Sequence, residues 1–249
     1  MSDAIPRERG LGEEPEAGRS EERQAAHAEE REAGARPQKR AIRIGVTGPI
    51  GCGKTTVGGW LAERGAVVID ADEVARELTA PGQPAHDAIL SLFGDAVRAT
   101  DETLDRAALA RVVFRDPVYL AQLEAIIHPI VRPQILDRIV AADDAGAPGV
   151  VIEAIKLVEG RLAEVCDEVW LVVCASGPQR ERVIDRGLSP ADADQRINAQ
   201  AGLAERLRPH ATRVIDTSGP AADARARVAT AWADAIAAAE RSNRRADPS

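Results

Sequence analysis

One glycine-rich segment constrains the fold of this chain of 249 residues more than any other feature. Residues 48–55 read Gly-Pro-Ile-Gly-Cys-Gly-Lys-Thr and match the pattern G-x-x-x-x-G-K-[ST]. An apolar run at 42–46 precedes the segment, and a helical pattern at 54–64 follows it. This pattern binds phosphate when it links a buried strand to a helix N-terminus. The segment therefore predicts a nucleoside triphosphate site.

Each part of this loop has a chemical role that its residue type explains. Gly51 and Gly53 let backbone N–H groups converge on a phosphate without clashes from a Cβ. Lys54 would reach the β- and γ-phosphates, and the Thr55 hydroxyl would bind Mg²⁺. Cys52 is either a small spacer or, because it lies near a helix N-terminus, a reactive thiol. The residues expected to bind the nucleoside triphosphate are Gly51, Cys52, Gly53, Lys54, Thr55 and Thr56.

Four further apolar runs complete the pattern of a parallel sheet. They lie at residues 66–69, 149–152, 168–173 and, more weakly, 212–216. Helical patterns dominate 73–142, and an Ala-rich stretch at 221–239 predicts a closing helix. Short apolar strands separated by helices are typical of α/β proteins in which helices cover both faces of a parallel sheet.

The two ends of the chain differ in composition from the rest. Residues 1–40 are rich in charged residues, and apart from Ile5 and Leu11 they hold almost no large apolar side chain. Such a segment buries too little surface to offset its ordering entropy. We therefore expect disordered tails at 1–40 and 241–249, with the folded domain between them at 41–240.

Composition excludes several classes of protein. The formal net charge of -8 and the absence of a basic stripe argue against a nucleic-acid partner. No apolar run reaches the roughly 18 residues of a membrane span, and no secretory signal is recognisable. The cysteine count is odd, and Cys166 and Cys174 are interpreted as buried and unpaired. We expect a cytoplasmic protein with no membrane association and no obligate protein partner.

Carboxylates follow two of the predicted strands. Asp70 and Asp72 come at the end of the second apolar run, and Glu153 ends the third. Because ligands bind beyond the carboxyl ends of parallel strands, these side chains are expected near the γ-phosphate end of the loop. One aspartate would accept a proton from an attacking hydroxyl, and Glu153 would approach Mg²⁺. The alternatives are that Asp72 only caps a helix at 73–79 and that Glu153 is a solvated strand end.

Several short segments between residues 42 and 240 resemble dephospho-CoA kinases, a family of P-loop kinases. The phosphate loop alone is generic, but the remaining matches occur in a specific order. They are Asp70-Ala71-Asp72, Ala75-Arg76, Leu104-Asp105-Arg106, His128-Pro129 and, in a lid segment, Gln179, Arg182, Arg186 and Gln200.

The resemblance implies a three-layer P-loop NTPase fold with a five-stranded parallel sheet. It also implies a helical substrate-binding region at about 76–142 and a lid at about 177–208, both within a kinase domain at 41–240. The implied reaction is phosphorylation of the ribose 3′-hydroxyl of dephospho-CoA by ATP, with Mg²⁺, which is the last step of coenzyme A synthesis. The partners would be dephospho-CoA and ATP.

The resemblance also assigns roles to single residues. It makes Asp72 the catalytic base and has Arg186 close over the transferred phosphoryl group, while Lys54 and Thr55 act on the phosphates and Mg²⁺. The residues expected to bind substrate are Arg76, Arg106 and His128. The residue types leave alternatives: Arg106 pairing with Asp105, His128 as a satisfied histidine at a helix break, and Arg186 as a solvated charge.

Two positions depart from the family pattern. Ile155 and Lys156 lie where the family commonly carries Pro-Leu-Leu, and Lys156 would either meet a substrate phosphate or pair with Glu159. Thr217 stands where the family often carries Asn at the adenine edge. Contacts to substrate and purine at these positions are therefore left open.

Two other functions compete with this interpretation. One is another P-loop kinase of a small hydroxyl compound, such as shikimate or gluconate, although those chains are shorter and lack the Leu-Asp-Arg to His-Pro segment. The other is a non-catalytic nucleotide-binding module. Against it, the chain has no Asn-Lys-x-Asp guanine signature, and paired carboxylates follow the second strand.

Overall fold

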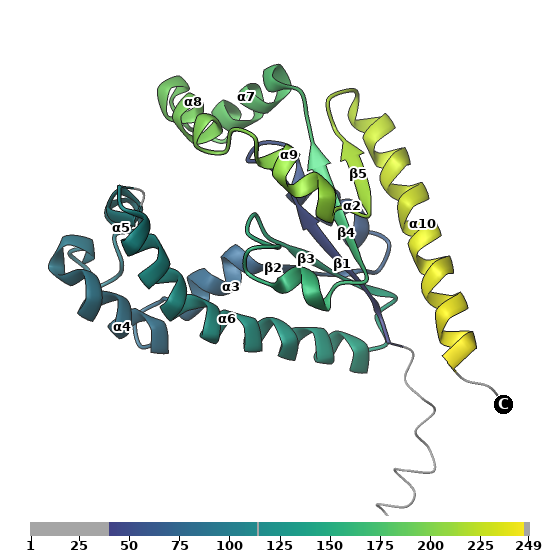
Figure 1. Cartoon of the computed structure of the whole chain (residues 1–249), viewed down its shortest axis with the longest axis horizontal. Coiled ribbons are helices and arrows are strands. Elements are labelled where there is room, and N and C mark those ends of the chain that lie inside the picture. The colour runs from purple at the N-terminus through teal and green to yellow at the C-terminus, as the bar shows by residue number, and fades with distance from the viewer. Residues whose placement is uncertain (1–39, 114, 247–249) are drawn as a thin grey trace, which may run out of the picture. The chain divides into compact units, whose positions relative to one another are not determined.

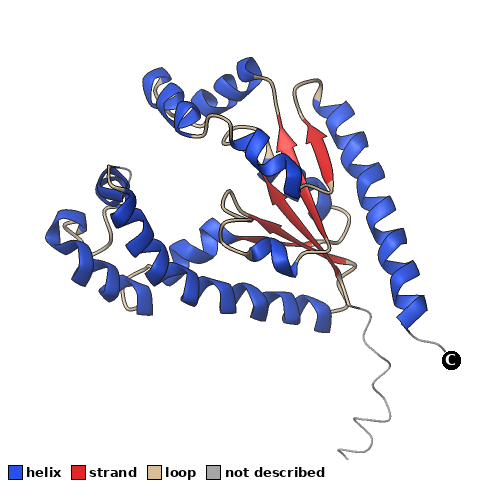
Figure 2. Ribbon diagram, in the orientation of Figure 1, coloured by secondary structure: helices blue, strands red, loops and turns tan. Residues whose placement is uncertain are grey.

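A computed structural model of the chain describes residues 40–113 and 115–246. The expected tail at 1–40 lies outside these residues except for Arg40. The described residues contain five strands in one parallel sheet, in the order β2-β3-β1-β4-β5 (Figures 1 and 2). Their bounds are Ile42–Thr47 for β1, Val67–Asp70 for β2, Gly149–Glu153 for β3, Glu168–Val173 for β4 and Arg213–Asp216 for β5. The predicted five-stranded parallel sheet is confirmed.

The register of the sheet brings the predicted site residues to one edge. Glu153 at the end of β3 is paired with Val46 of β1 and with Asp70 of β2. The phosphate loop begins at Gly48, two residues after Val46 and directly after the end of the central strand β1 at Thr47. Because all strands run in the same direction, the loop and the carboxylates meet at the same edge.

Helices cover both faces of the sheet. Helices α2 (Lys54–Ala62) and α10 (Ala221–Ala246) pack on one face, and α3 (Ala71–Leu78) and the second half of α6 (Pro117–Asp144) pack on the other. Side chains along β3 point alternately to the two faces of the sheet. Val151 packs in the core under α2 and α10, and Val150 and Ile152 pack in the core under α3 and α6. The three-layer arrangement agrees with the expected fold.

The closing helix is longer than the composition suggested. It continues to Ala246 instead of ending at Ala239, so the expected tail at 241–249 is wrong over 241–246. Residues 247–249 lie outside the described part. Ala and Arg are strong helix formers, and they carry α10 past its last contacts with the sheet.

A separate group of helices follows α3. Helices α4 (Pro84–Phe93) and α5 (Arg106–Val113), with the 3₁₀ turn η1 (Gly94–Val97), pack against the first half of α6 (Figure 1). They share a small core that includes Ile89, Leu104 and Leu109. Helix α6 runs on through two internal prolines, and its second half reaches the sheet, so it connects this helical group to the main core.

The segment between β4 and β5 is also helical. It contains α7 (Ser176–Asp185), α8 (Pro190–Ala199), α9 (Leu203–Leu207) and the 3₁₀ turn η3 (Arg208–His210). A further 3₁₀ turn, η2 (Leu162–Val165), follows β3. Leu203 and Leu207 of α9 pack on Leu171 of β4 and fix the end of the segment to the sheet. Among all described helices, none is both long and apolar enough to span a membrane.

Candidate active site

The phosphate loop needs glycine at positions where other parts of the chain approach closely. Gly51 has φ +78°, and a Cβ there would lie 2.7 Å from Cγ2 of Val183 and 2.8 Å from the carbonyl oxygen of Gln179. Gly48 has φ +143°, and a Cβ there would collide with the carbonyl oxygen of Val172. The loop is therefore packed between β4 and α7, in a backbone conformation that favours glycine.

Lys54 is the buried cation of the loop. Its side chain is only 9% exposed, and Nζ donates to the carbonyl oxygens of Gly48 (3.0 Å) and Pro49 (3.2 Å). Burial lowers its pKa, while the charges of Glu153 and Asp72 act in the opposite direction. These carboxylates favour the ammonium form, which the expected contact with phosphate requires.

Thr55 and Glu153 form the oxygen-rich side of the loop. The Thr55 hydroxyl donates to Oε1 of Glu153 at 2.7 Å, and Glu153 is 7% exposed, so its interpretation as a solvated strand end is wrong. Burial raises the pKa of Glu153, whereas the Thr55 hydrogen bond and Lys54 lower it.

This donor set fits Mg²⁺. Hydroxyl and carboxylate oxygens are the ligands that Mg²⁺ prefers, and it is commonly held by one or two protein groups together with substrate phosphates. The described residues hold no cluster of three or more His, Cys, Asp or Glu side chains able to bind a metal on their own. A site shared with substrate phosphates is the arrangement that these residues fit.

Asp70 and Asp72 divide two roles between them. Asp70 caps α3, because its Oδ1 accepts from the backbone N of Asp72 (2.8 Å) and of Glu73 (3.1 Å). The alternative in which Asp72 is the cap is therefore wrong, and Asp72 stands in the first turn of α3.

The pKa of Asp72 is raised. Its side chain keeps solvent contact, but the protein atoms around it displace part of its water, and this partial burial is the largest cause. The neighbouring Asp70 raises the pKa further, while Lys54 and Arg76 lower it. The interaction with Lys54 shows that the carboxyl group lies within electrostatic reach of the phosphate loop.

Two arginines lie together beside this carboxylate. Arg106, the first residue of α5, donates from Nη2 to the carbonyl oxygen of Arg76 (3.1 Å) and to Oγ1 of Thr79 (2.9 Å). Partial burial and the charge of Arg76 both lower the pKa of Arg106. Two nearby positive charges favour an anionic ligand. Asp105 caps α5 through the N–H of Ala108 and is not the partner of Arg106 in the described contacts.

His128 is placed differently from the two arginines. Its side chain is exposed on α6, and the helix continues through Pro129, so the alternative of a helix break is wrong. Among the described residues, His128 forms no hydrogen bond with Arg76 or Arg106. The structure therefore brings together two of the three expected substrate-binding residues.

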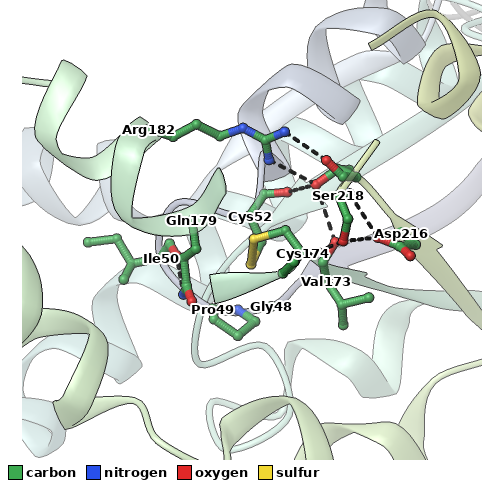
Figure 3. The surroundings of a disulfide bond; sticks show 12 residues. Gly48, Pro49, Ile50, Cys52, Val173, Cys174, Gln179, Arg182, Asp216 and Ser218 are labelled. Atoms are coloured by element: carbon green, nitrogen blue, oxygen red, sulfur yellow. Dashed lines mark hydrogen bonds between the residues drawn. A yellow bond between two sulfur atoms is a disulfide. The ribbon is translucent and has the colours of Figure 1, made fainter. Parts of the chain in front are cut away.

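The expected lid segment forms two hydrogen bonds with the phosphate loop. Nε2 of Gln179 on α7 donates to the carbonyl oxygen of Ile50 at 2.8 Å (Figure 3). The N–H of Ile50 donates to Oε1 of Gln200 at 2.7 Å. Sequence reasoning had included both glutamines in the lid without a role. The only available signal was their presence among the residues that matched the family.

Arg186 opens onto a cavity beside the loop. This cavity, of about 350 Å³, is lined by residues that include Gly53, Thr56, Trp60 and Arg186. Arg186 is the exposed residue that ends α7, and its charge acts on Lys54. The arrangement leaves the guanidinium free to approach a ligand held by the loop.

Thr217 braces the same cavity from the end of β5. Its hydroxyl donates to the carbonyl oxygen of Cys52 at 2.8 Å. Arg182 donates to Oγ1 of Thr217 at 3.0 Å and to its carbonyl oxygen at 2.7 Å. Thr217 therefore positions the loop, which is a role that the departure from the family pattern did not suggest.

Cys52 and Cys174 are joined by a disulfide, with their Cα atoms 5.1 Å apart (Figure 3). The expectation that Cys174 is an unpaired filler is wrong, and neither alternative for Cys52 described a covalent partner. Cys166 is the free cysteine of the described residues, and burial raises its pKa to about 12.

The site combines a glycine loop, a buried lysine, a hydroxyl–carboxylate pair and an aspartate within electrostatic reach of the lysine. This combination defines a P-loop phosphotransferase of the small-molecule kinase type. Comparisons with known proteins narrow this class. The family model for dephospho-CoA kinase matches residues 42–223, and the chain belongs to this family.

Individual relatives support the assignment. A dephospho-CoA kinase from Symbiobacterium thermophilum is 44% identical over 190 residues, which cover 76% of this chain and 79% of that protein. One from Synechococcus sp. is 48% identical over 160 residues, 64% of this chain and 76% of the relative. A crystal structure of a protein from Thermus thermophilus is 34% identical, with a TM-score of 0.67, and the match covers 78% of this chain and 96% of that one.

Proposed function

We propose that this chain transfers the γ-phosphoryl group of ATP to the ribose 3′-hydroxyl of dephospho-CoA, giving coenzyme A and ADP, with Asp72 as the base. The observation that carries the residue assignment is the position of Asp72. It stands in the first turn of α3, and its carboxyl group is within electrostatic reach of both Lys54 and Arg76. The acid is therefore close enough to a phosphate-binding cation and to a cation suited to an anionic acceptor for both charges to act on it.

Asp72 orients the 3′-hydroxyl and takes its proton as the oxygen attacks. A general base works best when its pKa approaches the working pH, and partial burial with Asp70 moves the pKa of Asp72 in that direction.

The phosphate loop holds the triphosphate through its backbone N–H groups and Lys54. Thr55 and Glu153 would hold Mg²⁺, which when bound neutralises charge on the β- and γ-phosphates. Arg186 approaches the transferred group from the end of α7 and stabilises the charge that spreads over its oxygens.

The helical region at about 76–142 provides the acceptor side. Arg76 and Arg106 bind phosphate groups of dephospho-CoA, and this assignment is supported by their shared site and by the mutual effect of their charges. His128 remains a proposed contact farther along α6. Binding of the acceptor between these helices and the loop keeps water away from the γ-phosphate.

The lid at about 177–208 closes over the bound nucleotide. Gln179 and Gln200 both form hydrogen bonds with Ile50, which couple the lid that carries Arg186 to the phosphate loop. Movements of this kind complete catalytic sites in many kinases. We further propose that the chain works in the cytoplasm, without nucleic acid, membrane or an obligate protein partner.

The direct test is incubation of the chain with ATP, Mg²⁺ and dephospho-CoA, followed by mass detection of coenzyme A. Shikimate and gluconate serve as alternative acceptors, with ADP release measured for each. We expect coenzyme A to form and ADP release to require dephospho-CoA. ADP release with shikimate or gluconate alone would favour another small-molecule kinase, and tight ATP binding without ADP release from any acceptor would favour a binding module.

A further inference from the structure

We propose that Cys52 and Cys174 are a thiol–disulfide exchange site, and that low-molecular-weight disulfides slow phosphoryl transfer by oxidising this pair. The inference rests on the proposed kinase function for its activity measurement. The chemistry at the two sulfur atoms is independent of that function.

The position of the bond links two parts of the catalytic apparatus. Cys52 lies inside the phosphate loop, next to Gly53 at the start of α2. Cys174 lies between the end of β4 at Val173 and the start of α7 at Ser176. We call residues 174–175 the β4–α7 connection. The disulfide therefore fastens the loop that holds the nucleotide to the connection from which the lid extends.

Noncovalent contacts hold the loop independently of this bond. Thr217 accepts from Arg182 and donates to the carbonyl oxygen of Cys52. Gln179 forms a hydrogen bond with Ile50 (Figure 3), and so does Gln200. Reduction therefore leaves the loop in a conformation able to bind ATP. What the disulfide adds is a restraint on the β4–α7 connection, which is otherwise attached through a hydrogen bond from the N–H of Ala175 to Oγ of Ser218.

The two sulfur atoms differ in accessibility. Cys52 is 2% exposed, whereas Cys174 is half-buried. A small thiol or disulfide therefore reaches Cys174 first, and Cys52 acts as the resolving partner. Cys166 provides an internal contrast, because burial raises its pKa to about 12 and its sulfur donates to the carbonyl oxygen of Leu162.

The exchange is balanced without any other reactant. The Cys174 thiolate attacks one sulfur of a small disulfide, a mixed disulfide forms on Cys174, and one small thiol leaves. The Cys52 thiolate then attacks the sulfur of Cys174, the protein disulfide forms, and the second small thiol leaves. The two protein thiols lose two electrons and two protons, and the small disulfide gains them. Excess small thiol reverses both steps.

The expected cytoplasmic location favours a reversible role of the Cys52–Cys174 disulfide over a structural one. Disulfides in the cytosol are usually transient and catalytic or redox-sensing. A bond between the loop and the β4–α7 connection limits the movement by which Arg186 approaches the γ-phosphate. We therefore expect oxidation to lower kcat by about tenfold while the affinity for ATP changes little.

The first experiment compares the oxidised and reduced full chain. The chain is equilibrated with oxidised or reduced dithiothreitol, its free thiols are counted by alkylation and mass measurement, and kcat and ATP affinity are measured for each form. Cys174→Ser should keep the rate of the reduced form under both conditions, and Cys166→Ser should respond like the wild type. Equal rates, or a faster oxidised form, would overturn the proposal.

The second experiment identifies the sulfur that reacts first and does not depend on Cys174→Ser folding or on activity. In Cys52→Ala, a small disulfide such as oxidised glutathione should leave a stable mixed disulfide on Cys174. In Cys174→Ala, the adduct on Cys52 should form much more slowly. Faster modification of Cys52 would contradict the proposed entry point. Failure of both redox forms to make coenzyme A would instead contradict the proposed function.

Discussion

The phosphate loop and the helical region that follows α3 build their binding groups in different ways. Around the loop, Lys54 and Glu153 are buried, and backbone and side-chain contacts from β4, β5 and α7 fix its shape. On the acceptor side, Arg76 and Arg106 are exposed residues on separate helices. Helix α3, which carries Arg76, packs on the sheet, whereas α5, which carries Arg106, packs in the small core of the helical region. The nucleotide side is therefore preformed, whereas the acceptor side depends on a few exposed side chains.

This difference predicts that mutations in the two regions affect different steps, namely ATP binding or acceptor binding. Changes in the loop should affect ATP binding and turnover together, because the same buried groups hold the ground state and the transition state. Changes in the helical region should act on the acceptor and leave ATP binding intact. The following variants test the separation, beginning with the largest expected effect.

Lys54→Ala should reduce both ATP affinity and turnover, with kcat/KM for ATP lower by roughly 10³–10⁵-fold. The variant removes the buried cation and leaves Glu153 without its opposing charge. Calorimetry and steady-state kinetics measure the two effects. Lys156→Ala is the matched control, because Lys156 forms its ion pair with Glu124 away from the loop. ATP affinity retained in Lys54→Ala would contradict the preformed phosphate site.

Arg186→Ala should lower kcat by about 10³-fold and change ATP affinity much less. The guanidinium is exposed at the end of α7, so its contribution appears when the lid closes on the transferred group. Single-turnover kinetics measure this step. Arg180→Ala removes another exposed arginine of α7, one paired with Asp194, and should have little effect. Equal rates for the two variants would show that Arg186 is a solvated surface charge without a role in phosphoryl transfer.

Arg106→Ala should raise the KM for dephospho-CoA by about 10- to 100-fold, the loss expected for a charged hydrogen bond to phosphate. ATP affinity should not change, since Arg106 lies on the acceptor side. Initial rates at varied dephospho-CoA measure the effect. Arg111→Ala on the same helix α5 is the control. A parallel loss of ATP affinity would break the proposed separation of the two regions.

Asp70→Asn should shift the pH dependence of kcat/KM. The Asp70 carboxylate raises the pKa of Asp72, so removing its charge lowers that pKa and moves the acidic limb to lower pH. The asparagine side chain still caps α3. Glu73→Gln, which removes an exposed carboxylate from the same helical turn, should leave the limb nearly in place. A shift to higher pH would show that another group titrates.

The same contrast explains how much the sequence could predict. The strands and the loop follow from contiguous apolar runs and a contiguous motif, so all five strands and the sheet were predicted correctly. The arginine cluster was predicted only as separate residues of a family pattern. The spacing in sequence does not reveal that Arg106 contacts the backbone of Arg76.

The contacts that were missed join residues far apart in the chain. The disulfide links Cys52 to Cys174 across 122 residues, and Gln200 reaches Ile50 across 150. Lys156 pairs with Glu124 and not with Glu159, because the end of β3 faces α6. Local patterns contain no information on such pairs, which arise only when the sheet brings the segments together.

Asp72→Asn tests the central claim most directly. The variant is nearly isosteric and removes only the proton acceptor, so ATP affinity measured by calorimetry should stay close to that of the wild type. The rate of coenzyme A formation in a single turnover, with saturating ATP, Mg²⁺ and dephospho-CoA, should fall by about 10²–10⁴-fold. A wild-type rate in this variant would contradict the assignment of Asp72 as the base.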